Sequence, residues 1–216
     1  MSSQSGSSSV RVKSHGDRVI EVIAVMLLGI ATVGSALCGY QATRWNGEQA
    51  RLIRVAADEH VESSRLFSLG TQTVAYDTNI VAQYAQAASA KDEKLMRFYR
   101  SSLVRPKFLP ILDRWEAEAS SGVLPLNLLD DQEYLDTQFG QYRKVEADAT
   151  ANTLLADEAG RNADAFVLTT LLLAVGLFFA GVTASFRVRV ARLMLLGGAA
   201  LTLSLAAARL VDLPFK

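Results

Sequence analysis

Three long runs of apolar residues, almost free of charge, constrain this 216-residue chain more than any other feature. The first run contains one charged side chain, Glu21, and the second contains none. As helices, both are long enough to cross a hydrocarbon core of about 30 Å. The third run is shorter, but Arg192 and Arg209 at its ends can extend to the lipid headgroups. We predict three transmembrane helices, at 19–40, 166–186 and 193–210.

The basic residues around these runs predict the orientation of the chain. Lys and Arg in short flanking segments favour the cytoplasmic side of a membrane. Six of them would share one side: Arg11, Lys13, Arg18, Arg187, Arg189 and Arg192. Between the spans we therefore expect an extracytoplasmic helical domain (41–165) and a basic cytoplasmic loop (187–192). A disordered cytoplasmic tail (1–18) should precede the first span, and an extracytoplasmic tail (211–216) should follow the third.

The first run has an alternative interpretation as a cleaved signal peptide. Gly34-Ser35-Ala36 resembles a cleavage site with small residues. The apolar run is longer than the usual apolar core of a signal peptide, about 7–15 residues, which favours an uncleaved span. A lipoprotein site at Cys38 is disfavoured because the bulky Leu37 precedes it, so we interpret Cys38 as a packing residue.

Residues 41–90 predict one long helix that continues the first span, because they contain no proline and many helix-forming residues. Apolar or small residues recur there mostly in steps of three, four or seven, which predicts a seam for partner helices: Leu52, Ala56, Ser63, Leu66, Gly70, Val74, Val81 and Tyr84. A second long helix should run from about Asp130 into the second span. Between them we expect short helices, bent or broken at Pro106 and Pro110.

The predicted fold class is therefore all-α. We expect an integral membrane protein with three transmembrane helices and an extracytoplasmic stalk of long helices. A break near Gly70 would instead give a compact extracytoplasmic bundle.

Composition and motifs give no indication of catalysis or nucleic-acid binding. The 22 basic and 22 acidic residues balance, so the chain lacks the positive excess of a nucleic-acid binder. One cysteine excludes a disulfide framework and a cysteine-rich zinc site. The sequence contains no nucleophile elbow, phosphate loop, dinucleotide-binding or zinc-protease motif. We predict no catalytic residue, no cofactor and no metal site; the acidic residues beside His60 fit a solvated helix face better than a cation site.

A polar cluster, which we call the collar, is expected where the chain leaves the first span and enters the second. Its members are Arg44, Trp45, Asn46, Glu48, Gln49, Arg161, Asn162 and Asp164. Helical rise places the two groups at similar heights above the membrane. We predict that Glu48 pairs with Arg161, or Arg44 with Asp164, and locks the two helices together. A site for a lipid headgroup or another ligand is the alternative.

Several stretches together carry a family resemblance. They are YQATRWNGEQA after the first span, a helical segment containing FYR, the sequence Arg-Pro-Lys-Phe-Leu-Pro, and two closing spans joined by a short arginine-rich loop. With them the chain resembles a family of uncharacterised bacterial three-span inner-membrane proteins over most of residues 18–210. The resemblance implies an uncleaved first helix, three spans and a bacterial inner membrane, and it implies no catalytic residue.

The function that these patterns favour is a non-enzymatic scaffold or interaction subunit of an envelope assembly. Its expected partners are the lipid bilayer and a second copy of the chain or other membrane proteins, without nucleic acid. The alternative is an extracytoplasmic sensory or ligand-binding module that works with a separate signalling partner. A channel or transporter has less support, because Glu21 is the one charged residue within the predicted spans apart from Arg209 at the end of the third.

Overall fold

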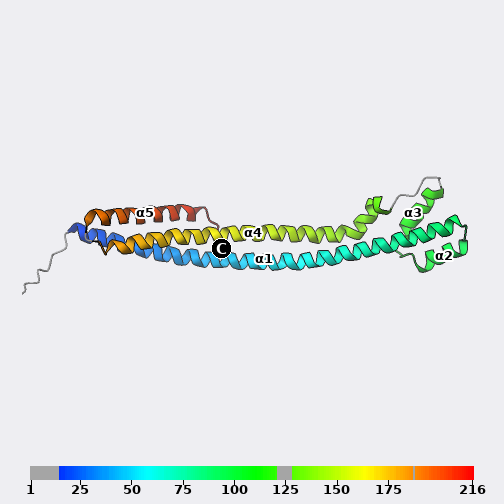
Figure 1. Ribbon diagram of the computed structural model, residues 1–216, viewed down its shortest axis with the longest axis horizontal. Coiled ribbons are helices and arrows are strands. Elements are labelled where there is room, and N and C mark those ends of the chain that lie inside the picture. Colours follow the sequence, from blue (N-terminus) through cyan, green and yellow to red (C-terminus); the bar gives the residue numbers. More distant parts are fainter. Residues whose placement is uncertain (1–14, 121–127, 187) are drawn as a thin grey trace, which may run out of the picture. The chain divides into compact units, whose positions relative to one another are not determined.

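The computed structural model describes residues 15–120, 128–186 and 188–216 (Figure 1). Its elements are α1 (His15–Ser89), α2 (Glu93–Ser102), α3 (Leu109–Ser120), the 3₁₀ turn η1 (Leu128–Asp130), α4 (Gln132–Thr183) and α5 (Arg189–Val211). The described residues contain no strand, which confirms the all-α fold class. The disorder predicted for 1–18 falls mainly on residues outside the described ranges.

Three helices, α1, α4 and α5, are long and apolar enough to cross a membrane. In each, less than a third of the most apolar window is buried within the protein. Most of these side chains therefore face outward, where lipid is the favourable environment. Helix α1 continues unbroken through Gly70, so the predicted long helix is confirmed and the predicted alternative of a break is not observed.

The chain forms two compact units. Unit 1 comprises Met1–Arg51 and Leu155–Lys216, and unit 2 comprises Leu52–Leu154. Both long helices, α1 and α4, contribute to each unit.

In unit 1, α5 lies beside α4 and the first part of α1 (Figure 1). Gly176 of α4 adjoins Leu203, and Gly198 of α5 adjoins Phe179, so α4 and α5 are antiparallel. The core consists largely of small residues and a few large ones: Ala31, Cys38, Ala42, Phe166, Leu173, Leu203 and Ala206. Small residues allow membrane helices to approach closely. Cys38 is fully buried in this core, which confirms its interpretation as a packing residue.

In unit 2, α1 and α4 pair as an antiparallel hairpin along the predicted seam. The Asn152 amide donates to Glu59 at 2.8 Å, and the Phe67 and Phe139 rings lie 5.8 Å apart. Six seam positions are buried: Leu52, Ala56, Ser63, Gly70, Val74 and Tyr84. The other two, Leu66 and Val81, are half-buried, so the predicted seam is confirmed.

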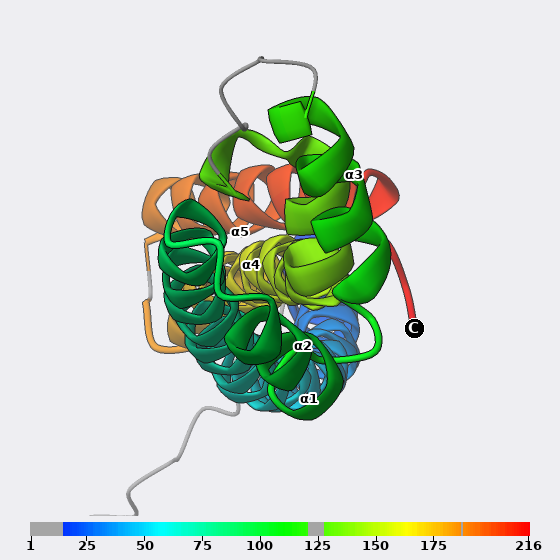
Figure 2. The same ribbon diagram turned by 90° about the vertical axis from the view of Figure 1, so that its right-hand side faces the viewer.

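Helices α2 and α3 lie beside the last turns of α1 (Figure 2). Asp92 caps α2 by accepting a hydrogen bond from the Leu95 amide at 2.9 Å. Pro106 lies in the turn between α2 and α3, and Pro110 occupies the first turn of α3, where proline is tolerated. The buried members of the surrounding core are Val74, Ile80, Tyr84, Val104, Phe108, Leu112, Leu128 and Tyr134.

Alanine substitution at Gly47 and at Gly70 of α1 should change the stability of the protein in opposite directions. A Cβ on Gly47 would meet nothing within 4 Å, so Gly47→Ala should stabilise the protein by up to about 1 kcal/mol through helix propensity. A Cβ on Gly70 would lie 2.6 Å from the Phe139 ring and 3.2 Å from the Gln138 carbonyl oxygen. Gly70→Ala should therefore destabilise it by about 1–2 kcal/mol despite the same propensity gain. Thermal unfolding of the full chain measures both; shifts of the same sign would contradict the close approach at Gly70.

Candidate functional site

The collar residues lie in unit 1, but they do not form the predicted ion pairs. The Glu48 carboxylate accepts hydrogen bonds from Arg51 Nε at 3.1 Å and Nη2 at 2.8 Å, and it lies 3.6 Å from Lys216 Nζ. Arg161 and Asp164 are exposed and form no ion pair with any described residue. The predicted Glu48–Arg161 pair is therefore wrong. The Glu48 carboxylate instead contacts Arg51, on the same helix, and Lys216, after α5.

Of the remaining collar residues, Gln49 connects α1 and α4, and it does so without charge. The Arg44 guanidinium lies 6.0 Å from the centre of the Tyr40 ring and forms no ion pair with Asp164, so the alternative pair is also wrong. Gln49 packs on Gly160, where an added Cβ would lie 2.5 Å from the Gln49 amide nitrogen. Two further members are Asn46, which is exposed, and Asn162, which is half-buried. The two helices therefore meet at this level through a glutamine and a glycine.

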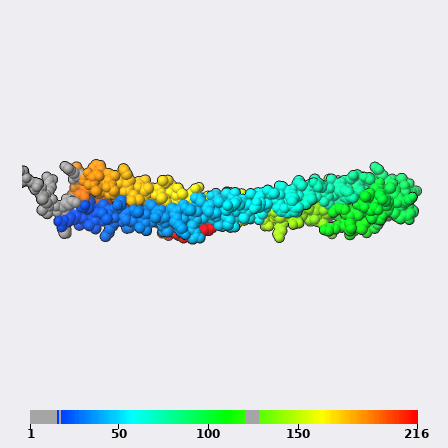
Figure 3. Space-filling view, turned by 90° about the horizontal axis from the view of Figure 1, so that it is seen from below, coloured from blue at the N-terminus to red at the C-terminus, as the bar shows by residue number. Residues whose placement is uncertain are grey.

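The segment after α5 occupies the collar, which the sequence analysis did not anticipate. The buried Gln41 amide forms two hydrogen bonds with the main chain of Lys216. Its Nε2 donates to the Lys216 oxygen at 3.0 Å, and the Lys216 N–H donates to its Oε1 at 3.0 Å. The glutamine side chain thus uses both its donor and its acceptor on the main-chain oxygen and N–H of one residue. The C-terminal end of the described chain lies against α1 (Figures 1 and 3).

Aromatic contacts complete the attachment of this segment. The Trp45 indole donates to the Pro214 carbonyl at 3.0 Å. Lys216 Nζ lies 4.2 Å from the centre of the Trp45 ring, a cation–π geometry. The Phe215 ring packs edge-on against the buried Phe166, with centres 5.5 Å apart.

We call Gln41, Trp45 and Glu48 the tail-binding row. They are spaced by four and three residues, so they share one face of α1. Together they offer an amide for a main chain, a ring for a cation and a carboxylate for the same cation. The arrangement binds an extended peptide segment that carries a lysine.

The contact between Glu48 and Lys216 should be insensitive to pH across the physiological range. Hydrogen bonds from Arg51, aided by the positive charges of Arg51 and Lys216, lower the pKa of Glu48 from 4.5 to about 2. A lowered pKa contributes stability above the unfolded-state value, and this stability is lost as the pH falls toward the folded-state value. Trp45 fluorescence in a Trp115→Phe chain should therefore stay constant from pH 8 to pH 5. A transition near pH 6 would contradict this assignment.

Unit 2 contains a buried charged cluster that the sequence analysis missed. Asp77 is 1% exposed and accepts hydrogen bonds from Arg105 Nε at 2.9 Å, Arg105 Nη2 at 2.5 Å and the Tyr134 hydroxyl at 2.7 Å. Burial, together with the hydrogen bond to Asp77, raises the pKa of Tyr134 above its ordinary value. The cluster joins α1, the turn between α2 and α3, and α4.

A second polar cluster borders a groove in unit 2. The Tyr84 hydroxyl donates to Glu116, and Arg100 pairs with both Glu116 and Asp113. Burial, followed by the hydrogen bond to Glu116, raises the pKa of Tyr84 to about 12. The groove has a volume of about 800 Å³, and Trp115 and alanines of α1 and α3 form much of its wall.

His60 takes part in the helix seam. Its Nδ1 lies 3.3 Å from the Glu146 carboxylate, which also accepts a hydrogen bond from Ser63 at 2.6 Å. The hydrogen bond from Ser63 is the main cause that lowers the pKa of Glu146. Within the described residues, no group of three or more His, Cys, Asp or Glu side chains could hold a metal ion.

Comparisons with protein-family models, with curated proteins and with solved structures found no match. The resemblance described for the YQATRWNGEQA stretch therefore stays a prediction. The candidate sites rest on contacts within the chain, namely the tail-binding row in unit 1 and the two polar clusters and the groove in unit 2.

Proposed function

We propose that this chain is a membrane-embedded interaction subunit whose unit 2 binds a second copy of the chain. The observation that carries the proposal is a mostly apolar groove of about 470 Å³ along the side of α4 in unit 2. Its lining residues are Tyr142, Arg143, Glu146, Ala147, Thr150, Ala151 and Leu154. Leu154 is 64% exposed there.

The hairpin of unit 2 supports a helical partner for this groove. Two antiparallel helices cover only one face of each other, and α4 presents a further face on which alanines alternate with larger side chains. Small residues accept the ridge of another helix. A second hairpin placed on this face would complete a four-helix bundle, and twofold symmetry would bury both grooves at once.

The oligomeric state of the full chain tests this proposal. Native mass spectrometry in detergent should find a dimer of the wild type and a monomer of the double variant Ala151→Arg, Leu154→Arg. The matched control is Val61→Arg, because Val61 is an apolar residue of unit 2 that is 71% exposed outside the groove. A monomeric wild type, or equal dissociation of control and groove variant, would contradict the proposal.

The proposed location is a bacterial inner membrane, with the N-terminus cytoplasmic and unit 2 extracytoplasmic. The six Lys and Arg residues that share one side support this orientation. The contact between Gln41 and Lys216 supports placing the segment after α5 on the same side as the residues that follow the first span. Labelling of Ser101→Cys in intact cells tests it, since Cys38 is buried. Labelling only after the inner membrane is permeabilised would contradict the orientation.

A second candidate function is ligand binding by the groove beside Tyr84. Its volume of about 800 Å³ and its wall of Trp115, Met96 and alanines suit a small, largely apolar molecule. Native mass spectrometry should then detect a ligand of fixed mass in the wild type that Ala88→Trp excludes. The control Ala90→Trp lies outside the groove. Equal retention by both variants would contradict this function.

A further inference from the structure

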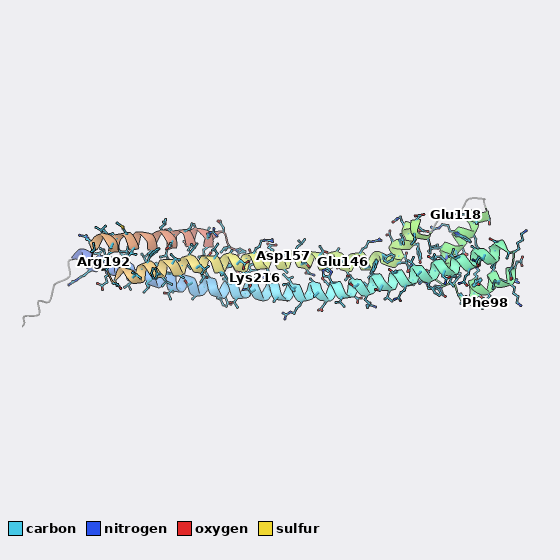
Figure 4. All side chains as sticks on the ribbon, viewed as in Figure 1. Phe98, Glu118, Glu146, Asp157, Arg192 and Lys216 are labelled. Atoms are coloured by element: carbon cyan, nitrogen blue, oxygen red, sulfur yellow. The ribbon has the colours of Figure 1, made fainter. Side chains whose placement is uncertain are left out.

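The short helix α2 presents an apolar outer face that nothing in unit 2 covers. None of its residues is buried. Met96 and Tyr99 pack against the core of unit 2 on its inner side. On the other side, Leu95 is 38% exposed and Phe98 is 53% exposed. Phe98 lies on the outer side of the helix (Figure 4). Helix α2 thus has two apolar faces. One packs on the core of unit 2, and the other, formed by Leu95 and Phe98, is exposed.

Cations flank the exposed apolar pair. Lys94 precedes Phe98 by four residues, so the two are neighbours on the outer face. Arg97 is exposed and follows Lys94 by three residues, so it lies beside Lys94, where it also borders a small groove with Glu93. Neither forms an ion pair with any residue in the described part of the chain. The nearby Asp92 carboxylate is occupied, because it accepts the hydrogen bond that caps the helix. The outer face therefore carries positive charge that no carboxylate of unit 2 neutralises by contact.

A third cation is held in an uncommon backbone conformation. Lys91 has a φ of 55°, in the left-handed region, and it is the one non-glycine residue with positive φ in the described chain. It stands just after the end of α1, at a position where glycine is the usual residue. The Asp92 amide reaches back to the Ala87 carbonyl at 3.0 Å and closes the turn. The turn into α2 thus retains a lysine where backbone geometry favours glycine.

We propose that the outer face of α2, made by Lys91, Lys94, Leu95, Arg97 and Phe98, binds an anionic lipid surface. Apolar side chains of an amphipathic helix enter the boundary between headgroups and acyl chains, while flanking cations contact lipid phosphates. Phe98 and Leu95 line neither the groove beside Tyr84 nor the groove of α4, and both side chains are exposed. A deformable lipid surface accepts protruding side chains, whereas a folded protein needs a matching pocket. The partner differs from that of the α4 groove, so this inference goes beyond the proposed function.

Flotation of the full chain with lipid vesicles tests the proposal. The protein is embedded in nanodiscs of phosphatidylcholine, and vesicles of phosphatidylcholine with or without 30% phosphatidylglycerol are added. We expect binding to the phosphatidylglycerol vesicles to be at least about tenfold stronger. Both Lys94→Gln, Arg97→Gln and Leu95→Ser, Phe98→Ser should lower that binding about tenfold or more, since each removes one of the two contributions.

Matched controls separate this face from general effects of charge and polarity. Lys144→Gln removes an exposed cation of α4, and Val61→Ser removes an exposed apolar residue of α1 that lies outside the α4 groove. Both should leave vesicle binding unchanged. Equal binding to the two vesicle types, or equal losses in the controls and the α2 variants, would overturn the proposal. Loss of a co-purifying protein from the α2 variants, with no vesicle binding by the wild type, would overturn it too, and would assign the face to a protein partner.

Discussion

Replacement of Asp77 with alanine should lower the free energy of unfolding of unit 2 by about 3 kcal/mol. The buried carboxylate accepts three hydrogen bonds, and alanine leaves the Arg105 guanidinium and the buried Tyr134 hydroxyl without this partner. Loss of one member of a buried ion pair costs about 3–5 kcal/mol. We expect the lower end of that range, because the Arg105 side chain is 33% exposed and water can solvate it.

Hydrogen exchange of the full chain in nanodiscs measures this effect. Helices α2 and α3 should open most readily, because the cluster attaches the turn between them to α1 and α4. A loss of 3 kcal/mol corresponds to roughly 100-fold faster exchange of their protected amides. The matched control is Asp136→Ala, since Asp136 and its partner Arg143 are both more than half exposed. It should cost less than about 1 kcal/mol. Equal exchange in the two variants would contradict the role assigned to Asp77.

The helical framework follows from sequence patterns because periodicity acts locally along one helix. The spacing that marks Gly70, Val74 and Tyr84 as seam residues predicts their burial correctly. Asp77 stands on the same spacing, three residues after Val74. A charged residue at a seam position signals a buried pair, so the cluster had a visible sign. Its partner was not predictable, because Arg105 reaches it from an irregular turn that no periodicity describes.

The contacts of the collar could not be predicted from helical rise alone. Rise per residue places Glu48 and Arg161 at similar heights, but it does not set the rotation of each helix about its axis. Packing turns Gln49, rather than Glu48, toward Gly160 of α4. Glu48 then pairs with Arg51, which lies one turn away on the same helix, so the pair requires no tertiary contact.

The attachment of the segment after α5 had even less sequence signal. Residues 212–216 have no periodicity, and their partners precede them by about 170 positions. The spacing of Gln41, Trp45 and Glu48 marks one face of α1, but not what covers that face. Only the tertiary arrangement of α1, α4 and α5 in unit 1 brings the two together.

Replacement of Gln41 with alanine should release this segment from the tail-binding row. The substitution removes both hydrogen bonds to the main chain of Lys216. Each contributes about 0.5–1.5 kcal/mol net, so their loss should raise the released population by roughly 5- to 150-fold. Lys216→Ala should have a smaller effect, because it keeps the main-chain bonds and removes only the contacts of the ammonium group with Trp45 and Glu48.

Quenching of Trp45 by iodide, in a Trp115→Phe chain, reports on release directly. In the attached state the Trp45 indole N–H is bonded to Pro214 and the Lys216 ammonium lies over its ring, so both features are lost when the segment leaves. The control is Gln49→Ala, which removes a glutamine of the same helix that packs on Gly160 and makes no hydrogen bond to the segment. Gln41→Ala should increase quenching strongly, and Gln49→Ala should leave it near the wild-type value. If iodide quenches Trp45 equally in the two variants, the amide of Gln41 does not hold the segment. The attachment then depends on the ring contacts of Phe166 and Trp45.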